Sequence, residues 1–206
     1  AGYKVEREYL INDAGTQAAL FADTVFARYK QLFGRDAELP PNGYQGDYVI
    51  DLAREIKEEV GDRFLDASQT PAELKRLAID KMVDRIRADM IAMGVHYDVW
   101  FRESSLYEES AFQTAMQLLR SRGAVVEKEG AVWFASSSLG VDKDNVLIRS
   151  NGAPTYFASD IAYHYDKFFR RGFDKVIDIW GADHQGHVSR VKTAVQALGV
   201  EEGRLE

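Results

Sequence analysis

The chain of 206 residues contains no cysteine. This excludes disulfides, thiolate nucleophiles and zinc or iron–sulfur sites held by cysteine. No apolar run approaches the roughly 18 residues that a membrane span requires. No basic segment followed by an apolar one opens the chain, so a secretory signal is not expected either. We therefore expect a cytoplasmic protein without a membrane partner.

Several catalytic signatures are also missing. The sequence has no G-x-x-x-x-G-K-[ST], no G-x-S-x-G and no G-x-G-x-x-G, which argues against P-loop NTPases, α/β-hydrolases and ordinary Rossmann dehydrogenases. Basic residues are in the minority, with 26 Lys and Arg against 33 Asp and Glu, a formal net charge of −7. Since proteins that wrap nucleic acid by bulk charge are basic, any contact with a polynucleotide is expected to be local or to lie outside this chain.

What is present is enough for a folded α/β protein. Hydrophobic residues make up 46% of the chain and aromatic residues 12%, so a sizeable core is expected. The chain opens at Ala1-Gly2 without an initiator methionine, and we interpret it as a fragment of something longer.

The first half of the chain is predicted to be mostly helical after an initial strand. Thr70 and Pro71 have the character of a helix start, with Thr as the N-cap and Pro in the first turn. Alternating apolar residues predict a strand over 3–11. Helical spacing predicts helices over 17–33 and 70–93, and between them a helix that residues 44–48 lead into, with an apolar stripe over 49–60.

The second half alternates strands and helices. Glu129-Gly130 is typical of a hairpin turn. Strands are predicted over 95–101, 124–134 (a hairpin), 145–149 and 175–180, and helices over 105–122, 155–170 and 186–198. Because strands followed by helices stand at both ends of the chain, we expect a parallel sheet with crossovers, interrupted by a helical insertion.

Residues 181–187 (G-A-D-H-Q-G-H) form the first candidate site. They follow a short apolar segment and open a helix, which is where open α/β sheets bind ligands and where helix N–H groups face phosphates. Asp183 is suited to ribose hydroxyls, and His184 and His187 to phosphate oxygens or a transition state. Two alternatives stay open: a polar turn whose histidines only cap the helix, and a metal site, although no third His is near and no H-E-x-x-H is present.

Tyr156 and Asp160 form the second candidate site. Four residues apart on a predicted helix, they share a face, and a carboxylate beside a phenol suits a cationic ligand. The alternative is a half-buried Tyr beside a surface Asp. Asn12 and Asp13, at the end of the first strand, are expected at the same crevice, although a turn-and-cap pair is the commoner use of Asn-Asp.

Four stretches together resemble bacterial-type arginyl-tRNA synthetase, a class I aminoacyl-tRNA synthetase. They stand in the family's order over nearly the whole chain, and together they are more specific than any single motif. They are residues 5–17 (V-E-R-E-Y-L-I-N-D-A-G-T-Q), 44–48 (Y-Q-G-D-Y), 153–164 (A-P-T-Y-F-A-S-D-I-A-Y-H) and 181–187.

The resemblance implies an incomplete class I Rossmann-like parallel sheet, with residues 1–14 and 95–206 as its portions and 15–94 as a mostly helical insertion. It implies activation of L-arginine with ATP, accompanied by Mg²⁺, to arginyl-adenylate, and transfer of arginine to tRNA(Arg), which is contacted mostly by domains outside this chain. No tightly bound metal held by protein residues is expected.

The resemblance also implies roles for single residues. Tyr156 and Asp160 fall where the family holds the guanidinium, and Asn12 and Asp13 at the edge of that pocket. Gly181, Asp183, His184 and His187 fall near the nucleotide, with the two histidines as catalytic candidates, and His164 is expected to be supporting structure.

Two family motifs are absent from residues 1–206: the H-I-G-H type, expected upstream of Ala1, and the K-M-S-K type, expected beyond Glu206. We therefore expect the chain by itself to be inactive. The alternatives are a catalytically inactive binding module derived from a synthetase, and another class I-like adenylate-forming enzyme with a different substrate.

Overall fold

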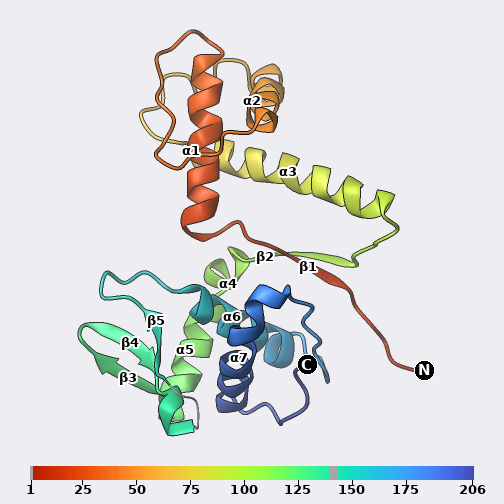
Figure 1. The fold of residues 1–206 in the computed structure, drawn as a ribbon, viewed down its shortest axis with the longest axis vertical. Helices are drawn as coiled ribbons and strands as arrows, with labels where there is room; N and C mark the ends of the chain where they lie inside the picture. Colours follow the sequence, from red (N-terminus) through yellow and green to blue (C-terminus); the bar gives the residue numbers. More distant parts are fainter. Residues whose placement is uncertain (1, 140–142) are drawn as a thin grey trace. The chain divides into compact units, whose positions relative to one another are not determined.

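A computed structural model describes residues 2–139 and 143–206, and the chain divides into two compact units, Ala1–Arg102 and Glu103–Glu206. The fold is mixed α/β and mostly helical (Figure 1). Its strands form two small sheets, one parallel and one antiparallel. In the described part of the chain, no helix combines the length and the apolar character of a bilayer span.

The first unit contains the parallel sheet. Strand β1 (Glu8–Ile11) pairs with β2 (Val99–Arg102), from Glu8 opposite Val99 to Ile11 opposite Arg102. The parallel pairing expected from the sequence is confirmed for this pair. The connection between the strands is long because parallel strands cannot be joined by a tight turn. It holds helices α1 (Gly15–Gln31), α2 (Asp47–Val60) and α3 (Ala72–Ala92).

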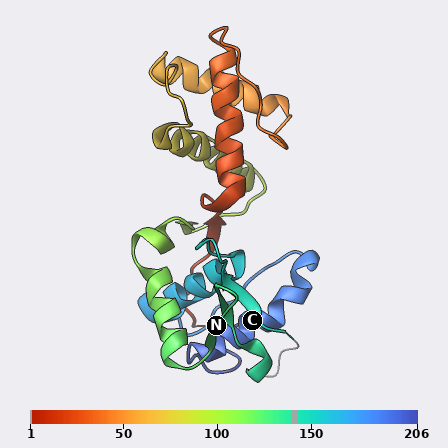
Figure 2. The ribbon, with the colours of Figure 1, turned by 90° about the vertical axis from the view of Figure 1, so that its left-hand side faces the viewer.

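The core of the first unit lies among these three helices, where α1 packs against both α2 and α3 (Figure 1 and Figure 2). Tyr29 of α1 is fully buried at its centre. Its hydroxyl donates to the carbonyl of Gly61 at 2.6 Å and accepts from the amide of Phe64 at 3.3 Å. Burial raises the pKa of this phenol. One side chain thus satisfies two backbone groups in the turn after α2.

The second unit combines an antiparallel sheet with helices. Strands β3 (Val125–Lys128) and β4 (Ala131–Phe134) form the predicted hairpin, and β5 (Asn145–Ile148) pairs with β4. Glu129 and Gly130 both have positive φ, 55° and 72°, as a type I′ turn requires. The helices are α4 (Ser105–Glu108), α5 (Ala111–Ser121), α6 (Tyr156–Tyr165) and α7 (Gln185–Ala197), with a π-helical turn over Asp166–Arg170 and 3₁₀ turns over Ser136–Leu139 and Ala182–His184.

Three sequence predictions need correction. The helix predicted over 105–122 is broken, because Ser110 adopts a left-handed conformation (φ 63°) between α4 and α5. Helix α3 begins at Ala72, so the N-cap is Pro71 and not Thr70 as expected, and the Thr70 hydroxyl donates to Asp23 at 2.6 Å.

The strand predicted over 175–180 is the third correction. Among the described residues, this segment makes only a parallel bridge between Val176 and Leu205, with backbone hydrogen bonds to residues 204–206. A β-strand needs a paired strand along its whole length, but here only the three residues 204–206 are available to pair with it. Ile177 and Ile179 are consequently 64% and 95% exposed.

Candidate functional site

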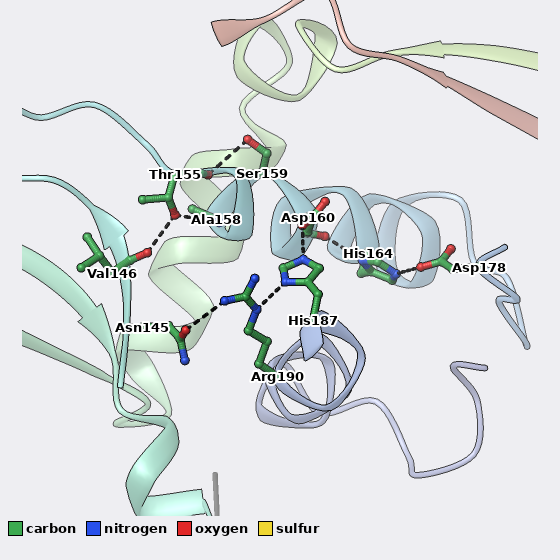
Figure 3. A network of polar contacts seen from close by, with 10 residues as sticks. All are labelled: Asn145, Val146, Thr155, Ala158, Ser159, Asp160, His164, Asp178, His187 and Arg190. Carbon is green, nitrogen blue, oxygen red and sulfur yellow. Dashed lines mark hydrogen bonds and ion pairs between the residues drawn. The ribbon is translucent and has the colours of Figure 1, made fainter. Parts of the chain in front are cut away.

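The start of helix α6 fixes the position of the Tyr156/Asp160 pair. Thr155 is the N-cap: its hydroxyl accepts from the amide of Ala158 at 3.3 Å and donates to the carbonyl of Val146 at 2.8 Å (Figure 3). The first bond satisfies an amide at the start of the helix, and the second ties that start to strand β5. Tyr156, the first residue of α6, is 57% exposed, and Asp160 follows one turn later on the same face.

Asp160 is in direct contact with the start of helix α7, which follows the loop after residue 180. Its Oδ2 lies 2.6 Å from Nε2 of His187, in the first turn of α7. The imidazole of His187 is mostly buried, and the rings of Trp180 and Phe157 lie 5.3 Å and 5.8 Å from it. The two candidate sites of the sequence analysis therefore meet at one hydrogen bond (Figure 3).

The other nitrogen of His187 is also engaged. Nε of Arg190, one turn further along α7, donates to Nδ1 of His187. Nη1 of Arg190 lies 3.4 Å from Oδ1 of Asn145 on β5, and its guanidinium lies over the ring of Phe157 at 5.5 Å. Figure 3 shows these side chains in sequence from Asn145 through Arg190 and His187 to Asp160.

A second polar network, which is buried, lies at the C-terminal end of α6. His164 is 1% exposed; its Nδ1 lies 2.7 Å from the Asp160 carbonyl oxygen and its Nε2 lies 2.7 Å from Oδ2 of Asp178. Nζ of Lys167 lies 2.9 Å from Oδ1 of the same Asp178. Burial alone would raise the pKa of Asp178, but His164 and Lys167 outweigh it and lower that pKa to about 2. His164 is thus internal structure, as expected.

Tyr107 of α4 adds a further group near Asp160. Its hydroxyl lies 2.6 Å from Oγ of Ser159. Burial raises the pKa of Tyr107, the bond to Ser159 opposes this, and the charges of Glu103 and Asp160 raise it further. The Tyr107 hydroxyl therefore stays protonated and uncharged at neutral pH, and the nearby Asp160 carboxylate keeps its negative charge.

A cavity of about 310 Å³ opens beside the 181–187 loop. Gly181, Ala182 and His184 of this loop line it, next to the start of α7, whose first amides are free of partners within the helix. Apolar side chains and the basic side chain of Lys192 also line the cavity. The other lining residues are Asp178, Trp180, Gln185, Val188, Val191, Lys192, Leu205 and Glu206.

Comparison with known proteins assigns the chain to a family. Residues 1–205 match the family model described as tRNA synthetases class I (R), catalytic domain. The chain belongs to this arginyl family of class I tRNA synthetases. The resemblance found in the sequence is thereby confirmed.

Individual members of the arginyl family are similar to this chain in sequence and in structure. The chain is 50% identical to an arginine–tRNA ligase of Dehalococcoides mccartyi and 51% identical to one of Carboxydothermus hydrogenoformans, each alignment covering 100% of this chain and 37% of the ligase. A crystal structure assigned as an arginyl-tRNA synthetase from Campylobacter jejuni matches with a TM-score of 0.87 and 37% identity, over 100% of this chain and 45% of that one. The chain thus spans 37% of the length of the two ligases and 45% of the Campylobacter jejuni chain.

The structure brings together part of the predicted site of this synthetase-family chain. Five of the predicted residues lie in the second unit: Tyr156 and Asp160 on α6, Gly181 and His184 on the segment that leads into α7, and His187 in the first turn of α7. The side chain of Asp183 lies outside the described side chains. Which of these residues contact arginine or ATP stays a prediction.

Asn12 and Asp13 lie in the first unit. Asn12 is exposed, whereas Asp13 is buried and forms an ion pair with Arg102 at 3.2 Å, and its amide donates to the Ile11 carbonyl. Asp13 does not cap α1, because Ala14 takes the N-cap position without a side-chain cap bond, and a role at the pocket's edge stays a prediction for both residues.

Sequence reasoning missed four residues of the site. Arg190 was within reach, because it stands three residues after His187 and residues so spaced are neighbours on a helix. The others come from separate elements, so no local spacing points to them. They are Asn145, Asp178 and Tyr107.

Proposed function

We propose that the protein to which this chain belongs activates L-arginine with ATP and transfers it to tRNA(Arg). In this proposal, residues 1–14 and 95–206 are portions of a Rossmann-like nucleotide-binding fold, and 15–94 form an insertion. Asp160 pairs with the substrate guanidinium and Tyr156 lies against it. Gly181, Asp183 and His184 lie along the nucleotide, with His187 beside them.

The observation that carries the proposal is the 2.6 Å contact between Asp160 and His187. It means that a cation held by the Asp160 carboxylate lies beside the loop that lines the 310 Å³ cavity. Two substrates that must react with each other need adjacent pockets, because positioning supplies much of the rate. A carboxylate at that junction favours a cationic substrate over a neutral one.

The chemistry is two displacements. A carboxylate oxygen of arginine attacks the α-phosphorus of ATP, the bond to the β-phosphate bridging oxygen breaks, and pyrophosphate leaves. A hydroxyl of the terminal ribose of the tRNA then attacks the arginyl carbonyl carbon, and AMP leaves with the electrons of the broken acyl bond. His184, beside the cavity, is suited to donate to phosphate oxygens as charge develops there.

Mg²⁺ is expected to travel with the phosphates of ATP. Among the described residues, no group of three or more His, Asp or Glu side chains is arranged to hold a metal ion. We further propose a cytoplasmic protein that contacts tRNA mainly through parts outside this chain.

The test is Asp160→Asn in the full-length protein. Loss of one partner of a charged pair predicts weaker arginine binding by about 2–4 kcal/mol, read as a raised KM for arginine in pyrophosphate exchange with the KM for ATP unchanged. Asp174→Asn, at an exposed carboxylate of the same unit, is the matched control. An unchanged KM for arginine in Asp160→Asn would contradict the assignment and favour an adenylate-forming enzyme for another substrate.

The chain by itself gives a second test. Because residues 1–206 contain neither the H-I-G-H nor the K-M-S-K type of motif, we expect no arginine-dependent pyrophosphate exchange from them alone. Clear turnover by this chain would show that these two motifs are dispensable.

A further inference from the structure

The hydrogen bonds around His187 have a fixed direction. Both side-chain nitrogen contacts of Arg190 are donations, because a guanidinium has no acceptor. Nδ1 of His187 must therefore accept, so it carries no proton. The proton of a neutral imidazole then lies on Nε2, which donates to the Asp160 carboxylate at 2.6 Å.

Asn145 fixes the other end of this chain of bonds. Its amide nitrogen donates to Oγ of Ser136 at 3.1 Å and to the carbonyl of Lys143 at 2.9 Å. Its oxygen is thus left to face Arg190 at 3.4 Å. The guanidinium is held from a second side by the ring of Phe157, so Arg190 is placed by strand β5 and helix α6 together.

We infer that Arg190 is a positioning residue for the arginine site: it fixes His187 as the Nε2–H tautomer, which orients the Asp160 carboxylate toward the substrate guanidinium. This inference rests on the proposed function. His187 contacts Oδ2 of Asp160, and among the described residues Oδ1 has no hydrogen-bond partner and is available to a ligand. Neither ring nitrogen of His187 is left for a phosphate, so contact with the nucleotide falls to His184.

The first experiment measures the tautomer directly and needs no substrate. In the ¹⁵N-histidine NMR spectrum of the protein, with His187 assigned by its loss in His187→Gln, we expect the Nε2–H pattern at neutral pH. In Arg190→Met, which keeps the aliphatic stem and removes the donors, we expect this single pattern to be lost. An Nδ1–H or doubly protonated His187 in the unsubstituted protein overturns the inference, whatever the substrate is.

The second experiment uses the full-length protein and separates the two substrates. Arg190→Met should raise the KM for arginine about tenfold or more, the scale of a lost hydrogen bond to a charged group, with a smaller change in kcat and no change in the KM for ATP. His187→Gln should raise the KM for arginine as well, but less than Arg190→Met does, because a Gln amide N–H can donate to Asp160 from near the position of Nε2. Arg120→Met on α5, whose nearest acidic group is 3.9 Å away, is the matched control.

The outcomes are distinguishable. A raised KM for ATP with an unchanged KM for arginine, in Arg190→Met or His187→Gln, overturns the inference and returns His187 to the nucleotide. If Asp160→Asn leaves arginine binding intact, the proposed function fails, while the NMR experiment still decides the tautomer.

Discussion

Replacing Asp178 by asparagine is expected to destabilise the second unit by about 2 kcal/mol at neutral pH. The side chain is 13% exposed and is shared by His164 and Lys167 at 2.7 Å and 2.9 Å. Although burial opposes ionisation, these two partners lower its pKa from 3.8 to about 2. Each factor of ten in proton affinity is worth about 1.4 kcal/mol, which gives the expected magnitude.

The sign of the pH dependence follows from the same shift. A carboxyl group whose pKa is lower in the folded state stabilises the fold above its unfolded pKa, and this contribution is lost as the pH falls toward the folded pKa. The stability difference between the unsubstituted protein and Asp178→Asn should therefore stay constant at neutral and mildly acidic pH. It should close between pH 3.8 and about 2.

The assay is urea unfolding followed by tryptophan fluorescence, together with hydrogen exchange of the segment 156–170, which reports on the second unit alone. Asp174→Asn, an exposed carboxylate of the same unit, controls for the change in net charge. A difference below about 0.5 kcal/mol at neutral pH, or one that is the same at about pH 6 and about pH 3, would refute the reasoning.

Two further predictions concern stability. Thr155→Val should cost about 1 kcal/mol in urea unfolding, because the N-cap acceptor for Ala158 is lost, and Thr155→Ser should restore it. Tyr29→Phe should destabilise the first unit by about 1–3 kcal/mol, since it leaves the carbonyl of Gly61 and the amide of Phe64 without their shared partner. An effect of Tyr29→Phe no larger than that of Tyr48→Phe, at a partly exposed phenol, would show that this buried bond is weak.

Much of the fold was predictable because local chemistry decides it. The Glu129-Gly130 turn needs two residues at positive φ, and the sequence offers a glycine there between two alternating runs. Gly61 likewise follows α2 at φ 62°, a conformation that few other residues adopt. Such signals depend on neighbours in the chain, so the helices of the first unit and the hairpin could be expected from it.

The missed features depend on contacts far along the chain. No residue near Ser110 in the sequence predicts a break in the helix. The contacts around it are long-range: Glu109 forms an ion pair with Arg170 at 2.7 Å, and Leu106 is buried. Residues 175–180 have the composition of a strand, but a ladder requires a partner of equal length.

At the site, the same limit holds. The four-residue spacing of Tyr156 and Asp160 was enough to place them on one face. The hydrogen bond from His187 to Asp160, by contrast, joins two residues that are 27 positions apart in the sequence and lie on different helices. Spacing alone cannot give that contact, because it depends on how α6 and α7 pack.

The exposed isoleucines of the 175–180 segment bear on how the protein behaves in concentrated solution. Ile177 and Ile179 are largely in water, and the amides of both residues have no backbone partner in the described part of the chain. Covering a side chain of this size is worth about 1.5–3 kcal/mol, so molecules of this chain gain by associating along this strip. Colloidal stability should therefore depend on these two positions, and threonine at both should raise the concentration at which the chain stays monodisperse.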